Sequence, residues 1–84
     1  MGHKQQIPAR LGEKLKAIRE HLGLTAEQLI ESLDCPLIAL NKAHIDKYEK
    51  NLRAPPSVIL LRYARLAGVF MDDLIDDTVD LELG

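Results

Sequence analysis

The chain has 84 residues, of which 46% are hydrophobic and none is tryptophan, and this suits one domain with a modest, mainly aliphatic core. No run of about 18 apolar residues occurs, so no transmembrane helix is predicted. The net charge of −2 is unevenly divided: residues 1–55 carry nine Lys and Arg against seven Asp and Glu, and residues 56–84 carry two against six. A basic face for nucleic acid can therefore come only from the first two thirds of the chain.

The start of the chain and its single cysteine indicate a cytoplasmic protein. The segment MGHKQQIPAR lacks the apolar stretch of a signal peptide, and Gln6 stands where N-myristoylation needs Ser or Thr. Cys35 has no partner for an intrachain disulfide, which fits a reducing compartment. No membrane association is expected.

Two helices are predicted in the first part of the chain. Apolar residues at three- and four-residue spacing predict a first helix over Pro8–Leu22, and Gly23 suits a left-handed cap at its end. A second, short helix is expected at about residues 25–33, where Thr25 and Gln28 have the spacing of a capping box.

The segment DCPLIALN separates the second helix from a third. Pro36 cannot lie inside a helix without breaking it. Asn41 is then a good N-cap for the helix KAHIDKYEK, in which Ile45 and Tyr48 form the buried pair. Asn51 can adopt the left-handed conformation that ends this helix.

The last third predicts two more helices and a tail. RAPP enforces an extended break before a fourth helix over Ser57–Ala67, which Gly68 ends, and MDDLIDD predicts a short fifth helix or turn. The short tail TVDLELG alternates apolar and acidic residues, as an edge strand would. Five short helices without repeats predict an all-α bundle in a single domain, with a core over about residues 9–76 and an acidic tail over 77–84.

The order of these pieces resembles the lambda-repressor-like, Xre-type helix-turn-helix family of DNA-binding domains, over Leu11 to Ile75. The matching pieces are Leu15 and Arg19 in the first helix, then LGLTAEQL, IDKYEKNLRAPP and LLRYARLAGVFMDDLI. The resemblance implies that the third helix enters the major groove of DNA.

The turn before the third helix departs from the family pattern. Asp34 stands where the family usually has glycine, and the segment from Leu33 to Ile45 is about five residues longer than usual. We interpret DCPLIAL as a lengthened turn. Its apolar residues are expected to fold back onto the core, and these are Leu37, Ile38 and Leu40.

The resemblance assigns DNA contacts to the outer face and flanks of the third helix. Lysines there can donate to guanine O6 and N7, and a small residue can contact a thymine methyl. Basic residues after the helix suit phosphate contacts, as does a glutamine near the second helix N-terminus, although Ala26 occupies the usual glutamine position. The alternative for all of these residues is an ordinary solvated surface. The expected contacts are Gln28, Asn41, Lys42, Ala43, His44, Lys47, Lys50 and Arg53.

Two further expectations concern packing. The resemblance implies an ion pair between Arg19 and Glu49 that holds the third helix against the first. The fourth helix carries core residues Leu60, Leu61 and Ala64 and a second apolar strip. Either the tail covers that strip or it forms a two-fold homodimer contact. The strip consists of Ile59, Tyr63, Leu66 and Phe70.

An enzyme is not expected. His3, His21 and His44 have no cysteine or carboxylate neighbours at metal-ligand spacing, and no glycine-rich phosphate loop or nucleophile motif occurs. We therefore expect no catalytic site, no metal and no cofactor.

The resemblance favours a sequence-specific transcriptional regulator whose partner is double-stranded DNA. The alternative is a protein-interaction module, antitoxin-like or a regulatory partner, that kept the fold without strong DNA binding. The net negative charge, the lengthened turn and the acidic last third favour this alternative. Surface charge separates the two: a continuous positive patch over Lys42, Lys47, Lys50 and Arg53 supports DNA binding, whereas acidic side chains that interrupt it support the alternative.

Overall fold

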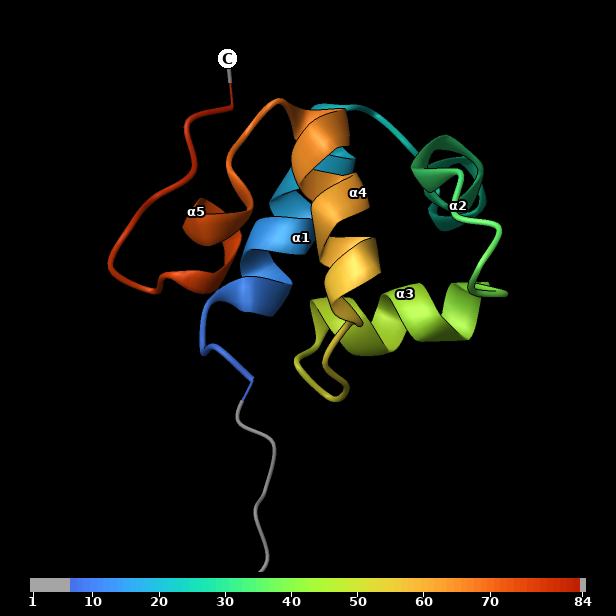
Figure 1. Cartoon of the computed structure of the whole chain (residues 1–84), viewed down its shortest axis with the longest axis horizontal. Coiled ribbons are helices and arrows are strands. Elements are labelled where there is room, and N and C mark those ends of the chain that lie inside the picture. Colours follow the sequence, from blue (N-terminus) through green and yellow to red (C-terminus); the bar gives the residue numbers. More distant parts are fainter. Residues whose placement is uncertain (1–6, 84) are drawn as a thin grey trace, which may run out of the picture.

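The computed structural model describes residues 7–83, which fold into five helices around one core (Figure 1). The described residues contain no strand, so the predicted all-α class is confirmed. None of their helices is both long enough and apolar enough to cross a membrane. The helices are α1 (Leu11–His21), α2 (Ala26–Leu33), α3 (Lys42–Glu49), α4 (Ser57–Ala67) and α5 (Met71–Ile75).

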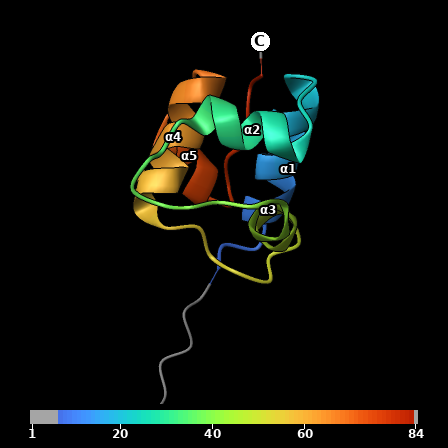
Figure 2. The same cartoon turned by 90° about the vertical axis from the view of Figure 1, so that its right-hand side faces the viewer.

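Helix α1 lies at the centre and contacts α3, α4 and α5. In Figure 1, α2 and α3 lie at the right and α5 with the C-terminal tail lies at the left. Figure 2, which views the molecule from that right-hand side, shows α2 crossing above α3, with the long green connection between them. The core is aliphatic apart from two tyrosines. Its members are Leu11, Leu15, Ile18, Leu29, Leu33, Ile45, Tyr48, Ile59, Leu60, Tyr63, Ala64 and Leu74.

Most helix ends follow the local signals. Gly23 and Asn51 have the predicted positive φ, at 68° and 57°, and Gly68, which ends α4 as predicted, also has a positive φ of 71°. The start of α1 differs from the prediction, because the helix begins at Leu11 rather than Pro8. The Pro8 carbonyl accepts a hydrogen bond from the Leu11 N–H at 3.1 Å, so the proline belongs to a turn that precedes the helix.

The lengthened turn folds back onto the core only in part. Asp34 takes the left-handed conformation, with φ of 45°. The N–H of Ile38 then bonds the carbonyl of Cys35 at 3.3 Å and closes a turn. Ile38 and Leu40 pack against the core, but Leu37 is 82% exposed because it lies at the tip of this turn. The prediction was therefore wrong for Leu37.

Only two of the four residues in the second apolar strip predicted on α4 are buried in the core. Ile59 and Tyr63 are fully buried, so they cannot form a dimer contact. The helix packs against α1, α2 and α5, and apolar residues on adjacent faces are buried together. Leu66 is half-buried and Phe70 is 78% exposed. Of the predicted core residues, Leu60 and Ala64 are buried and Leu61 is only half-buried.

The C-terminal tail is not a strand but is tied to the start of α1. The carboxylate of Asp77 accepts hydrogen bonds from the N–H groups of Ala9 and Arg10, each at 2.9 Å. The Arg10 guanidinium bonds the Asp77 carbonyl at 3.1 Å and the Asp80 carboxylate at 2.6 Å. The Asp77 carboxylate thus supplies acceptors for two backbone N–H groups just before α1, and Asp80 pairs with the Arg10 side chain. Farther along, Leu81 and Leu83 pack against the core.

A buried lysine joins α1 to α5. Lys14 is only 3% exposed, and its Nζ donates to the carbonyls of Asp73 and Asp76 at 2.6 and 2.7 Å. Both carbonyls lie at the C-terminal end of α5, where carbonyls lack helical partners and the helix dipole favours a cation. Lys14 is therefore a cap for α5.

The end of α3 lies unusually close to the start of α1. Gly12 is buried, and a Cβ atom there would lie 2.5 Å from the carbonyl oxygen of Glu49. The Asn51 side chain accepts a hydrogen bond from the Gly12 N–H at 2.8 Å and donates to the Ala9 carbonyl at 2.8 Å. Only glycine permits this approach without a shift of backbone.

We expect Gly12→Ala to lower the free energy of unfolding by about 1–3 kcal/mol, because the added methyl group forces the two backbones apart. Helix propensity alone predicts the opposite, a gain of about 0.5–1 kcal/mol. Urea unfolding followed by circular dichroism decides between the two, with Glu13→Ala on the exposed neighbouring position as the control. A stabilised Gly12→Ala variant contradicts the close contact.

The hydroxyl of Tyr63 is buried and has no hydrogen-bond partner among the described residues, and this burial raises the pKa of the phenol. We expect Tyr63→Phe to leave the free energy of unfolding unchanged or to raise it by about 1 kcal/mol, because an unsatisfied polar group is removed. Tyr63→Ala removes the ring as well and should cost about 3–5 kcal/mol. A loss of stability in Tyr63→Phe would show that the hydroxyl has a partner in solution.

Candidate nucleic-acid interface

Helix α3 turns one face into the core and the other to solvent. Ile45 and Tyr48 are buried, as predicted, and they pack the helix against its neighbours α1 and α2. The residues expected to contact DNA are exposed except for His44, which is half-buried. The exposed ones are Gln28, Asn41, Lys42, Ala43, Lys47, Lys50 and Arg53.

The N-terminus of α3 is closed by a reciprocal cap. The Asn41 side chain accepts a hydrogen bond from the His44 N–H at 3.1 Å, and the His44 Nδ1 accepts one from the Asn41 N–H at 3.1 Å. The imidazole also stacks on Tyr48, with ring centroids 6.4 Å apart. Because Nδ1 is an acceptor here, the ring proton lies on Nε2, which remains free to donate. Asn41 likewise keeps its amide N–H groups.

Gln28 has a similar double role at the start of α2. Its Oε1 accepts from the Thr25 N–H at 3.0 Å, and the Thr25 hydroxyl accepts from the Gln28 N–H at 3.1 Å. This is the predicted capping box. The side-chain amide N–H groups of Gln28 remain for a ligand, while its oxygen belongs to the cap.

The basic patch is interrupted by carboxylates. Lys42 Nζ lies 3.7 Å from Glu27, and Lys50 Nζ lies 3.1 Å from Asp46. All four side chains are between 58% and 73% exposed, so these pairs are solvated and contribute little to stability. Within residues 7–83, Lys47 and Arg53 make no ion pair.

The contact between Glu27 and Lys42 also shows that the N-termini of α2 and α3 lie near each other. Glu27 is in the first turn of α2 and Lys42 is the first residue of α3, so the two N-termini lie on one face. Each N-terminus carries a positive partial charge and free N–H groups that attract anions.

A groove of about 380 Å³ separates these two ends. Its walls are Ile30 and Leu40, and Glu27, Asn41 and Lys42 line its edge. Leu40, at the end of the α2–α3 connection, lines the groove and also packs against the core. Its apolar lining faces solvent beside the start of α3.

Sequence reasoning missed two of these features. Glu27 was not assigned to the interface, because it is distant from α3 in sequence and only tertiary packing places it beside Lys42. The histidine in the α3 cap was also missed, since Glu or Gln usually occupies that position. The three-residue spacing from Asn41 to His44 was the available signal for the second feature.

The predicted ion pair between Arg19 and Glu49 is present. The guanidinium donates to both carboxylate oxygens, at 2.6 and 2.9 Å, and also to the carbonyl of Leu24 at 3.2 Å. The hydrogen bond to Glu49 raises the pKa of Arg19. Only 9% of the Glu49 side chain is exposed, so the pair is well shielded from water. It joins α1, the end of α3 and the segment before α2.

The histidines are not gathered into a metal site in the described part of the chain. Residues 7–83 contain no cluster of three His, Cys, Asp or Glu side chains arranged to hold a metal ion. His21 is exposed at the end of α1, His44 belongs to the α3 cap, and His3 lies outside the described residues.

A double-mutant cycle measures the coupling energy between Arg19 and Glu49. We expect Arg19→Met and Glu49→Met each to cost about 2–3 kcal/mol, because one charged group is left without its partner. The double variant should cost less than the sum, with a coupling energy of about 1–3 kcal/mol. The control is the solvated pair Lys50–Asp46, for which alanine variants should give about 0.5 kcal/mol or less. Equal coupling in the two cycles would contradict the shielding.

Comparisons with models of protein families, with curated proteins and with solved structures give no match to this chain. A function can therefore be inferred only from the residues and the geometry described above.

Proposed function

We propose that this protein is a DNA-binding regulator of the lambda-repressor-like, Xre type that places α3 in the major groove. The observation that carries the proposal is the shared face of the α2 and α3 N-termini, where α2 packs against α3 and Glu27 approaches Lys42 at 3.7 Å. Two helix ends on one face suit the phosphates on either side of a groove. The outward residues Lys42, Ala43 and Lys47 then face base edges.

The size and shape of α3 agree with this role. It has eight residues, a closed N-terminal cap and a solvent-facing side that lacks large apolar residues. Its C-terminal end is held to α1 through Glu49 and Asn51. A helix held in this way presents its side chains in fixed directions, which direct readout of base edges requires.

The charge around α3 supports a modest affinity for DNA. Lys42, Lys47, Lys50 and Arg53 supply four positive charges, against which Glu27 and Asp46 supply two negative ones. The lysine–carboxylate pairs are exposed and weak, so phosphate oxygens can replace the carboxylates. Because phosphate contacts release counterions, such binding must weaken steeply with salt.

The same interruption favours a second candidate, a protein-interaction module without strong DNA binding. The positive patch is not continuous, since Glu27 and Asp46 each lie beside a lysine that the first proposal needs. Opposite charges side by side suit a protein partner with a mixed surface as well as they suit a phosphate.

A fluorescence-anisotropy titration with random-sequence duplex DNA, at low and at physiological salt, separates the two candidates. We expect the wild type to bind at low salt and Lys42→Ala/Lys47→Ala to weaken binding. Lys50→Ala/Arg53→Ala, which removes two expected phosphate contacts, should reduce the slope of log K against log salt by about 2. Glu27→Gln/Asp46→Asn should strengthen binding, because it frees two lysines. The control is Lys16→Ala/Arg65→Ala, which removes the same charge from exposed positions on α1 and α4.

Each outcome of the titration has a definite meaning. Loss of binding in the α3 variant alone supports the regulator and justifies selection of an operator sequence. Equal weakening in the control variant shows that only net charge matters. No binding by the folded wild type, even at low salt, rejects the proposal and supports the interaction module.

A further inference from the structure

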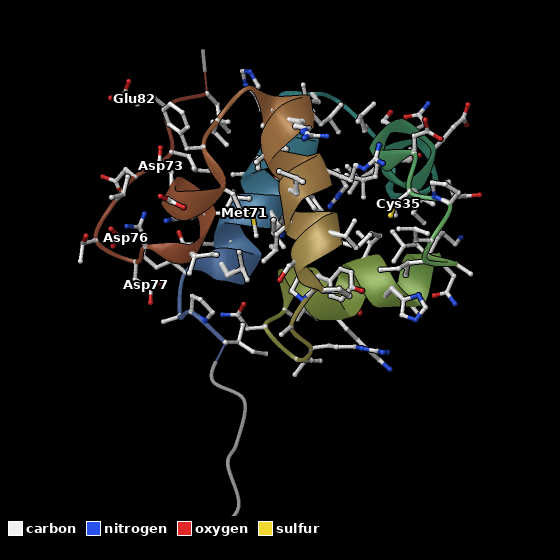
Figure 3. The ribbon with its side chains drawn as sticks, viewed as in Figure 1. Cys35, Met71, Asp73, Asp76, Asp77 and Glu82 are labelled. Carbon is white, nitrogen blue, oxygen red and sulfur yellow. The ribbon has the colours of Figure 1, made fainter. Side chains whose placement is uncertain are left out.

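A second surface feature lies on the side of the molecule away from α3. It is a hollow of about 250 Å³ between the α4–α5 turn and the C-terminal tail. In Figure 3, Asp73 and, above it, Glu82 lie at the left, whereas α3 lies at the lower right. The hollow is lined mainly by Val69, Phe70, Asp73, Val79, Asp80 and Glu82.

The apolar part of this hollow is dominated by an exposed aromatic ring. Phe70 is 78% exposed, a value that only Leu37 exceeds among the large apolar residues of the described chain. It precedes α5 with an extended backbone, at φ −78° and ψ 142°, and its neighbours Val69 and Val79 are half-buried. An exposed ring beside partly buried valines is a contact surface for another apolar side chain.

The charged part of the hollow is negative. Asp80 is paired with Arg10 at 2.6 Å, but the carboxylates of Asp73 and Glu82 make no hydrogen bond or ion pair within residues 7–83. The nearest buried cation, Lys14, is already bound to the backbone carbonyls of Asp73 and Asp76. Two carboxylates beside an exposed ring are therefore without a cation.

We infer that this hollow docks a partner protein through a basic segment in which an Arg or Lys side chain lies next to an apolar one. The apolar side chain covers Phe70, and the cation lies between Asp73 and Glu82. A guanidinium suits this position best, because it can bond carboxylates and also stack on an aromatic ring. The hollow is smaller than small-molecule sites, which are about 300–1,000 Å³, so a side chain fits it better than a metabolite.

This inference does not depend on DNA binding. The α4–α5 turn and the C-terminal tail, which line the hollow, lie on a different side of the molecule from α3 (Figure 1). The partner can therefore be held while α3 contacts DNA, and it can equally be held if α3 contacts none. The two tests use different residues and different ligands, so the failure of one leaves the other intact.

The test uses short labelled peptides and the intact chain. The probe is a Gly/Ser peptide with a central Arg-Leu-Arg, and its matched controls carry Glu-Leu-Glu or Arg-Ser-Arg. We expect the basic apolar peptide to shift the amide resonances of residues 68–73 and 79–83 in ¹H–¹⁵N spectra, with a Kd of about 0.1–1 mM. Phe70→Ser, and separately Asp73→Asn/Glu82→Gln, should each weaken binding by about tenfold or more.

Matched substitutions at the other end of the molecule are the control. Leu37 is 82% exposed on the α2–α3 connection, and Glu31 and Asp34 are exposed acidic residues nearby. Leu37→Ser and Glu31→Gln/Asp34→Asn therefore make the same chemical changes outside the hollow, and binding should not change. Thermal unfolding of every variant verifies that it is folded.

Three results would overturn the inference. The first is no shift in these residues at about 10 mM of the basic peptide, well above the expected Kd. The second is equal binding of the acidic peptide, or unchanged binding by the hollow variants. The third is a concentration-dependent homodimer in sedimentation that Phe70→Ser abolishes, because the occupant is then a second copy of this chain.

Discussion

The junction between α1 and the end of α3 determines how the rest of the molecule is presented. Arg19 and Glu49 form a shielded bidentate pair, and Asn51 bonds the backbone at Gly12. These contacts fix the C-terminal end of α3 at two points along α1, and the buried pair of α3 prevents rotation about its axis. The direction of its outward face therefore follows from α1. Loss of Gly12 would disturb that direction without touching a single outward residue.

The acidic last third of the chain serves partly as internal structure. Asp77 supplies acceptors to N–H groups that precede α1, and Asp80 pairs with Arg10. The carbonyls at the end of α5 hold Lys14, so α1 is joined to the tail through Asp77 and Asp80 and to α5 through a buried cation. A count of charges along the sequence treats all six acidic residues as free. Packing leaves only some of these carboxylates unpaired, and α5 and the tail, which carry all six, lie on the other side of the molecule from α3 (Figure 1).

Local signals predicted the helices, and tertiary packing set the parts that were missed. The cap residues Thr25 and Asn41 act within their own turns, so their roles could be predicted from spacing alone. The buried face of α4 could not be predicted from spacing. This helix packs against three neighbours, and its apolar residues cover more than one face of the helix. Leu37 is exposed because a hydrogen bond from Ile38 places it at a turn, and composition contains no sign of that. Glu27 and Lys42 are distant in sequence, and only the packing of α2 against α3 brings them together.

The lengthened turn changes the surroundings of α3 more than its placement. The added residues leave the bundle at the tip near Leu37 and return at Leu40, so α2 and α3 still pack against each other. Asp34 supports this path with its left-handed backbone. At the end of the connection, Leu40 lines the groove beside Asn41. A connection that projects outward and returns to the core can thus enlarge a surface while the helices on both sides keep their contact, because the core residues of α2 and α3 set that contact and the connection does not.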